Sequence, residues 1–201
     1  RPFFAKRPVS LTVGWSPVPT VSSRPVSATG RKGFGFRKGF MEEVAMRIDR
    51  RHPKIDTAAF NDVASFLADN AGNITSVKGV ADSMRQTKRG ISPTTVGEYI
   101  AAMRENYLLF RANRYDIKGK AYLQAMEKYY LGDPGFRFWF LGKTSGDLGH
   151  RIENVVYLEL LRRHRTVHIG KVGSTEVDFY TPDPESDHYY QVSLTVMDEK
   201  T

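Results

Sequence analysis

Three side chains that could together hold a divalent cation follow one another in the last quarter of the chain: Glu153, Asp178 and Gln191. Glu153 lies in the segment I-E-N-V-V-Y-L-E-L-L, whose apolar spacing predicts a helix. Asp178 lies in T-E-V-D-F and Gln191 in Y-Y-Q-V-S, and both segments predict strands. If these strands pair beside the helix, the three side chains converge. Their oxygens are ligands that Mg²⁺ accepts.

The pattern lacks a group that metal-assisted hydrolysis normally uses. A lysine near the third ligand would orient or deprotonate the attacking water and stabilise the developing phosphorane charge, but the chain ends this motif Gln191-Val192-Ser193. Ser193 does neither job well, and the amide of Gln191 brings no negative charge to hold a metal. The order helix, strand, strand resembles the site of PD-(D/E)XK nucleases. The same residues therefore indicate a nuclease-like fold and argue against cleavage.

The main alternative is an active Mg²⁺-dependent DNA nuclease, in which Glu153 and Asp178 hold the metal and Lys171 lends the missing ammonium. The helix predicted over residues 149–164 also carries Glu159, and carboxylates in so apolar a helix are costly unless solvated, paired or metal-bound. For Glu159 we expect exposure to solvent or pairing with Arg163 or Lys171. For Glu153 the structural and metal-binding interpretations both stay open.

Charge is unevenly distributed along the 201 residues, whose net charge is +8. Residues 1–40 hold eight Lys or Arg and no acidic residue, whereas the other 161 residues hold 22 basic and 22 acidic side chains. The Pro- and Gly-rich segment 1–40 could be a basic arm on nucleic acid, a linker, a remnant of a preceding domain or a misread start. The absence of cysteine excludes disulfides and thiolate metal sites. No apolar run reaches the roughly 18 residues of a membrane span, so we expect a cytoplasmic protein without a membrane partner.

Helical spacing predicts three helices between residues 56 and 106. The first follows the cap Asp56, the second covers about residues 76–86, and the third begins with the cap and proline of Ser92-Pro93 and runs to about Arg104. Short strands are expected at residues 107–111 and 122–123, around a turn at 116–120. This order is typical of a winged helix-turn-helix.

In this interpretation the third helix enters DNA and the two strands form a wing that contacts phosphate. Residues 76–120 carry nine basic against four acidic side chains, which favours nucleic acid. The alternative is a unit for packing or protein interaction alone. The outward candidates on the helix are Thr94, Thr95, Glu98 and Arg104, and those on the wing are Arg111, Arg114, Lys118 and Lys120.

Gly142-Lys143-Thr144 has the tail of a phosphate-binding loop. That motif needs a glycine at position 137, where the chain has arginine. We therefore expect no ATP binding and no ATPase activity in this chain.

The series F-L-A-D-N-A-G-N, S-P-T-T-V-G-E-Y-I, Y-D-I-K-G-K-A-Y-L, K-Y-Y-L-G-D-P-G-F-R, L-G-H-R-I-E-N-V-V-Y-L-E-L-L-R-R, G-K-V-G-S-T-E-V-D-F and Y-Y-Q-V-S-L-T-V runs from about Asp62 to the end. It resembles the C-terminal domain of unknown function that follows an AAA ATPase module in many bacterial and archaeal proteins. The resemblance implies a winged helix, then a nuclease-like domain with Glu153, Asp178 and Gln191 at its three stations. It also implies that the Q-V-S ending is normal for the family.

We therefore expect an α+β protein with a basic arm over residues 1–40, a helical winged-helix-like domain over 41–125 and an α/β restriction-endonuclease-like domain over 126–201, truncated at its C-terminus. The expected function is non-catalytic binding of DNA or a protein partner, within a prokaryotic AAA-type ATPase. A purely structural oligomerisation module, by self-association, is a further alternative. We expect no cofactor in this fragment, with Mg²⁺ the one candidate ion and ATP bound only by the missing N-terminal module.

Overall fold

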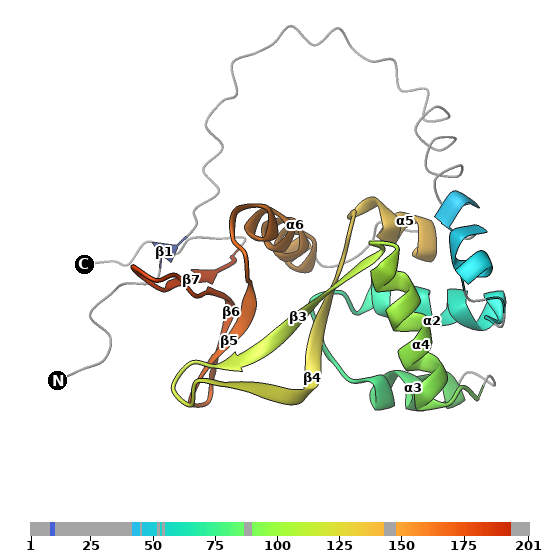
Figure 1. Ribbon diagram of the computed structural model, residues 1–201, viewed down its shortest axis with the longest axis horizontal. Helices are drawn as coiled ribbons and strands as arrows, with labels where there is room; N and C mark the ends of the chain where they lie inside the picture. Colours follow the sequence, from blue (N-terminus) through green and yellow to red (C-terminus); the bar gives the residue numbers. More distant parts are fainter. Residues whose placement is uncertain are drawn as a thin grey trace, which may run out of the picture. The chain divides into compact units, whose positions relative to one another are not determined.

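A computed structural model describes residues 9–10, 42–44, 46–51, 53, 55–86, 90–142 and 148–193 (Figure 1). The chain divides into two compact units, one made of residues 1–11 and 56–201 and the other of residues 12–55. In the second unit, residues 42–44 and 46–51 are helical. Apart from residues 9–10, the expected basic arm lies outside the described residues. No helix in the described ranges is long and apolar enough to cross a membrane.

The first unit is built on one seven-stranded sheet, which confirms a mixed α+β fold. The strands follow the spatial order β1-β7-β6-β5-β3-β4-β2 and pair antiparallel except for β1 with β7 and β3 with β5. The bounds are β1 Val9–Ser10, β2 Ile74–Thr75, β3 Leu109–Asp116, β4 Ala121–Leu131, β5 His168–Val172, β6 Thr175–Thr181 and β7 His188–Gln191. Because β3 pairs with both β4 and β5, the sheet is continuous. The expected boundary between residues 125 and 126 falls inside β4.

The helices begin where the capping residues predicted them. In α2, Thr57–Asp69, the Asp56 carboxylate accepts hydrogen bonds from the amides of Ala58 and Ala59. The bounds of α3 are Val77–Gln86, and α4, Pro93–Glu105, starts with the Ser92 hydroxyl accepting from the Thr95 amide. Two more helices follow the hairpin, α5 Gly135–Leu141 and α6 Leu148–Arg163.

Both hairpin strands are longer than the sequence predicted, and the first of them starts later. Tyr107 has a left-handed backbone with φ 57°, and its turn delays β3 to Leu109. The turn at residues 116–120 is confirmed, and the Asp116 carboxylate accepts hydrogen bonds from the amides of Lys118 and Gly119. β4 then runs to Leu131 and brings the K-Y-Y-L segment into the sheet.

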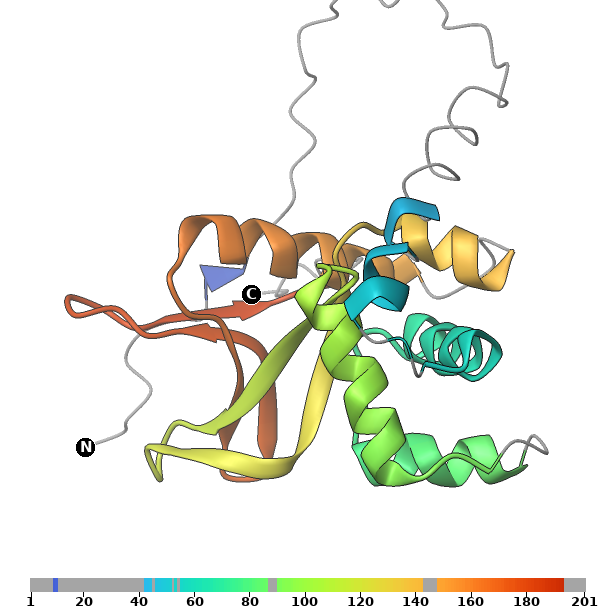
Figure 2. The same cartoon turned by 45° about the vertical axis from the view of Figure 1, so that its right-hand side comes forward.

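The helix α6 covers one face of the sheet and closes the core there (Figure 2). Tyr130 of β4, Tyr157 of α6 and Phe179 of β6 are almost fully buried, and the rings of Tyr130 and Tyr157 stack with centroids 4.2 Å apart. Tyr190 of β7 and Ile169 of β5 complete the same cluster. This packing fixes α6 over β6 and β4, and so fixes every polar side chain that α6 directs toward them.

Candidate functional site

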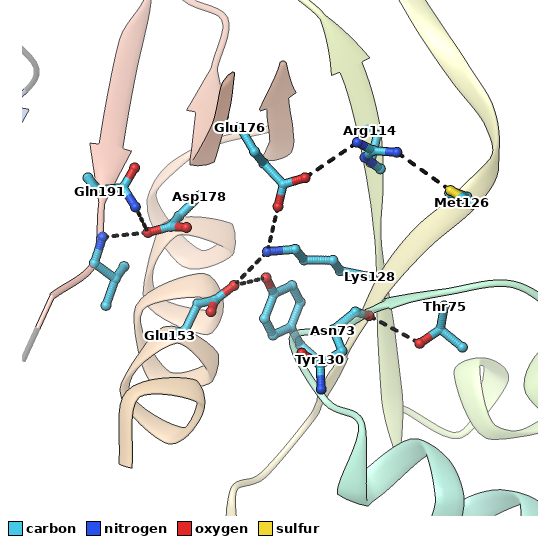
Figure 3. Close-up of polar contacts among 11 residues, drawn as sticks. Asn73, Thr75, Arg114, Met126, Lys128, Tyr130, Glu153, Glu176, Asp178 and Gln191 are labelled. Carbon is cyan, nitrogen blue, oxygen red and sulfur yellow. Dashed lines mark hydrogen bonds and ion pairs between the residues drawn. The ribbon is translucent and has the colours of Figure 1, made fainter. Parts of the chain in front are cut away.

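Glu153, Asp178 and Gln191 come together in one pocket, although they are far apart in sequence. Glu153 lies on α6, Asp178 on β6 and Gln191 at the end of β7 (Figure 3). The pocket has a volume of about 190 Å³, and its lining is Gly149, His150, Ile152, Glu153, Asp178, Gln191 and Val192. The meander β5-β6-β7 and the helix before it thus position the three stations in the way that strand pairing beside the helix predicted.

A lysine that the sequence analysis missed lies at the centre of the polar cluster. Lys128 of β4 places its Nζ 3.2 Å from Oε1 of Glu153 and 3.0 Å from Oε1 of Glu176 (Figure 3). Its side chain is only 8% exposed. The hydroxyl of Tyr130 donates a second hydrogen bond to Oε1 of Glu153, at 2.6 Å. The one signal in the sequence was a lysine followed at once by the apolar run Tyr129-Tyr130-Leu131.

Arg114 belongs to this cluster and not to the outward face of the wing. Its Nη2 lies 3.4 Å from Oε2 of Glu176, and its other terminal nitrogen faces the sulfur of Met126 at 3.9 Å. With its side chain 13% exposed and paired with Glu176, Arg114 presents little of its guanidinium to a phosphate. The expectation that it contacts nucleic acid is therefore corrected: Arg114 is a second internal cation for the carboxylates.

Burial and charge set the protonation of the cluster. Burial alone lowers the pKa of the Lys128 ammonium, but the attraction of Glu153 and Glu176 outweighs it and raises that pKa above its ordinary value. Burial also raises the pKa of Tyr130, and the Glu153 carboxylate adds to the shift, so Tyr130 stays a proton donor. Lys128 is thus a permanent cation at neutral pH and is unsuited to accept a proton from water.

Asp178 is held by its neighbours on β7. Its Oδ2 accepts hydrogen bonds from Nε2 of Gln191 and from the backbone amide of Val192, both at 2.7 Å. Burial raises the pKa of Asp178 above its ordinary value, although the Val192 amide opposes the shift. Gln191 therefore acts as a donor to the second station instead of as a third oxygen ligand.

These donors do not fit a Mg²⁺ ion. An ammonium already stands beside Glu153, and a divalent cation at the same carboxylate would be repelled by it. Gln191, the expected third ligand, donates its amide N–H to Asp178 and does not point its oxygen there. Within the described part of the chain, no group of three or more His, Cys, Asp or Glu residues is arranged to hold a metal ion. Lys128 and Arg114 offset the charges of Glu153 and Glu176, and Asp178 is held by neutral donors.

Two other predicted residues take different places. Lys171, the expected source of an ammonium, lies on β5 in register with Glu176 and Asp116, whereas Lys128 is the lysine that contacts Glu153. The expected pairing of Glu159 with Arg163 is confirmed, and Arg162 joins it. Hydrogen bonds from these two arginines lower the pKa of Glu159 to about 2. Glu159 has no part in the pocket.

Some of the residues predicted to contact nucleic acid are exposed, and others already bind a neighbouring side chain. Thr94, Arg104, Lys118 and Lys120 are exposed, as is the acidic Glu98. The Thr95 hydroxyl lies 2.9 Å from that of Ser92 and belongs to the helix cap. Arg111 is ion-paired with Glu127 at 3.1 Å on the neighbouring strand. The surface that remains open to a ligand is therefore the turn at 117–120 and the exposed side of α4.

Comparison with known proteins gives two matches, neither of which carries a described activity. A family model for a domain of unknown function (DUF8612) matches residues 37–147, which include Lys128 and Tyr130 but end before α6. An uncharacterized protein of Haemophilus influenzae is 30% identical over 183 residues, which are 91% of this chain and 44% of the relative. The chain thus spans less than half the length of that relative. No solved structure matches the chain significantly.

Proposed function

Since the chain belongs to the family of a domain of unknown function (DUF8612), we propose a function from its own geometry: it is a region of a longer protein that binds double-stranded DNA without cutting it. The observation that carries the proposal is the path of the chain through α3, α4 and the β3–β4 hairpin. The AAA ATPase module implied by the sequence resemblance would belong to the longer protein and remains a proposal for it.

The order of elements supports DNA binding. The chain runs through α2, the short β2, α3 and α4 into the hairpin, and β2 pairs with β4, which pairs with β3. A winged helix-turn-helix has this order and this three-stranded pairing. In such folds the second helix of the pair, here α4, enters the major groove, and the hairpin contacts the backbone. Thr94 at the start of α4 and Arg104 at its end are exposed for those contacts.

The turn of the hairpin supplies the positive charge. Lys118 and Lys120 are exposed, and within the described residues neither forms an ion pair with an acidic side chain. Asp116, the nearest carboxylate in sequence, is occupied by the amides of the turn. Two cations on a projecting turn suit the phosphates of a duplex.

The cluster around Lys128 supports binding without cleavage. Lys128 and Arg114 occupy Glu153 and Glu176, while Gln191 and Val192 occupy one oxygen of Asp178. Glu153 and Glu176 already have cations of the chain itself as counter-ions and need no metal in that role. Glu153, Asp178 and Gln191 therefore stabilise the folded chain and do not bind a catalytic metal.

Replacing Lys118 and Lys120 together by alanine should weaken binding to a short labelled duplex by about tenfold at moderate salt. The logarithm of the binding constant should also fall less steeply with the logarithm of salt concentration, by about 2 in slope, because two phosphate contacts are lost. Fluorescence anisotropy across a salt series measures both quantities. The matched control replaces Arg162 and Arg163, which removes the same charge from two side chains already paired with Glu159.

Two other results of this titration would contradict the proposal. Equal losses in the two double variants would show that only net charge matters and would contradict the hairpin as the contact. If the unsubstituted chain shows no salt-dependent binding, the DNA proposal is wrong. A dimer or larger assembly in light scattering would then favour the oligomerisation module.

A further inference from the structure

The sheet face opposite α6 carries a cluster of aromatic rings. Phe179 and Tyr190 point toward α6, and strand alternation directs their neighbours Tyr180 and Tyr189 to the other face. There Tyr180 stacks on Tyr115 of β3, with centroids 5.6 Å apart and planes 9° apart. His168 of β5 stacks on the same ring of Tyr115 at 5.5 Å.

Tyr122 lies at the outer end of this cluster and is 60% exposed. It is the strand partner of Tyr115, and its ring is nearly perpendicular to the stack, at 73° to Tyr115 and 75° to His168. Both centroid distances are 5.4 Å. Tyr115 and His168 therefore contact the ring of Tyr122 nearly at right angles, and a large part of its surface faces solvent.

The setting of Tyr122 is cationic and close to the proposed DNA contact. Lys118 and Lys120 lie four and two residues before it, on the turn of the same hairpin. The buried ring of His168 adds no charge at neutral pH, because burial lowers its pKa. Of the acidic groups near this cluster, Asp116 caps the turn and Asp187 lies beside Tyr180. Glu176 is ion-paired with Lys128 in the cluster that faces α6.

We propose that Tyr122 is a stacking site for an unpaired base, and that the preferred ligand is a duplex with an adjoining single-stranded segment. Lys118 and Lys120 contact phosphates where the duplex meets that segment, while an unpaired base of the segment lies on the exposed ring. A rigid aromatic surface beside two mobile cations is the combination that binds single strands with little sequence preference. The inference rests on the proposed DNA-binding function and specifies the ligand of the same surface.

The test compares a blunt duplex with the same duplex carrying an oligothymidine tail. The unsubstituted chain should bind the tailed duplex about tenfold more tightly, which is the scale of one base stacked on an aromatic ring. Tyr122→Ala should lose this preference and keep its affinity for the blunt duplex, whereas Tyr122→Trp should keep the preference. Tyr107→Ala is the matched control, since Tyr107 is 71% exposed and lies outside the cluster.

The two proposals fail in distinguishable ways. Equal binding of blunt and tailed duplexes by the unsubstituted chain would overturn the stacking site and leave DNA binding intact. Absence of binding to both would overturn both proposals. A preference that survives in Tyr122→Ala, or that is lost equally in Tyr107→Ala, would also contradict the role of Tyr122. Even if Tyr122→Ala does not fold, equal binding of the two ligands by the unsubstituted chain overturns the stacking site, and so does a preference that Tyr122→Trp loses.

Discussion

Lys128→Met should lower the free energy of unfolding by about 3 kcal/mol, because it leaves the largely buried Glu153 without its cation and Glu176 with Arg114 alone. Methionine fills the space of the lysine stem, so the loss measures the charge and not a cavity. Glu153 and Glu176 would then face each other and Asp178 with only Arg114 nearby. Urea unfolding at neutral pH, followed by circular dichroism, measures the change.

The pH dependence of the same effect has a definite sign. The pKa of Lys128 is raised in the folded chain, so its contribution to stability is fully present below the ordinary lysine value of 10.5. That contribution is lost only as the pH rises through the raised value. The difference between the unsubstituted chain and Lys128→Met should therefore stay constant from neutral pH to about pH 10.

A pair of controls on α6 separates the cluster from ordinary surface charge. Glu153→Gln and Glu159→Gln make the same chemical change on one helix, but only Glu153 contacts Lys128. We expect a clear loss of stability for Glu153→Gln and no measurable loss for Glu159→Gln. Adding Glu153→Gln to Lys128→Met should cost less than the sum of the two single changes. Full additivity, or a Lys128→Met chain as stable as the unsubstituted one, would contradict the cluster as described.

Asn154→Ala should cost about 3 kcal/mol, because the buried backbone N–H and C=O of Leu131 lose their hydrogen bonds to the Asn154 side chain. The Asn154 side chain is buried, its Nδ2 donating to the Leu131 carbonyl at 2.9 Å and its Oδ1 accepting from the Leu131 amide at 2.8 Å. Leu131 has β3 on one side, and β2 pairs with β4 only at residues 127 and 128. The asparagine takes the place of a strand neighbour at this end of β4.

Hydrogen exchange gives a local measurement of the same change. The Leu131 amide should exchange much faster in Asn154→Ala, together with a lower urea midpoint. Val155→Ala is the control, since the adjacent Val155 is largely exposed and should change neither quantity. Unchanged protection of Leu131 in Asn154→Ala would show that another group satisfies its backbone.

Short sequence patterns predicted where several helices begin and which segments form strands. The caps Asp56 and Ser92 predicted the starts of α2 and α4, and the residue pattern predicted the two neighbouring strands that carry Asp178 and Gln191. Lys128 could not be placed in this way. It meets Glu153 only because β4 runs on to Leu131 and α6 packs over it, and neither contact has a signature in the residues near position 128.

Arg114 was misplaced for a related reason. A register irregularity between Ala112 and Arg114 interrupts the regular alternation of β3, and a shift of one residue exchanges the two faces of a strand. The parallel pairing of residues 114–116 with 169–171 then brings Arg114 toward Glu176. Contacts between distant segments decide both placements, across 25 residues for Lys128 with Glu153 and 62 for Arg114 with Glu176, and short-range patterns do not report them.

One experiment tests both parts of the central claim, that this chain binds DNA and that it does not cut it. The unsubstituted chain and Asp178→Asn are incubated with end-labelled blunt and tailed duplexes in Mg²⁺ or Mn²⁺, and each reaction is divided between a native and a denaturing gel. We predict retarded DNA on the native gel and full-length strands on the denaturing gel, with both chains alike. Shortened strands that appear with the unsubstituted chain and not with Asp178→Asn would contradict the account and identify an active nuclease.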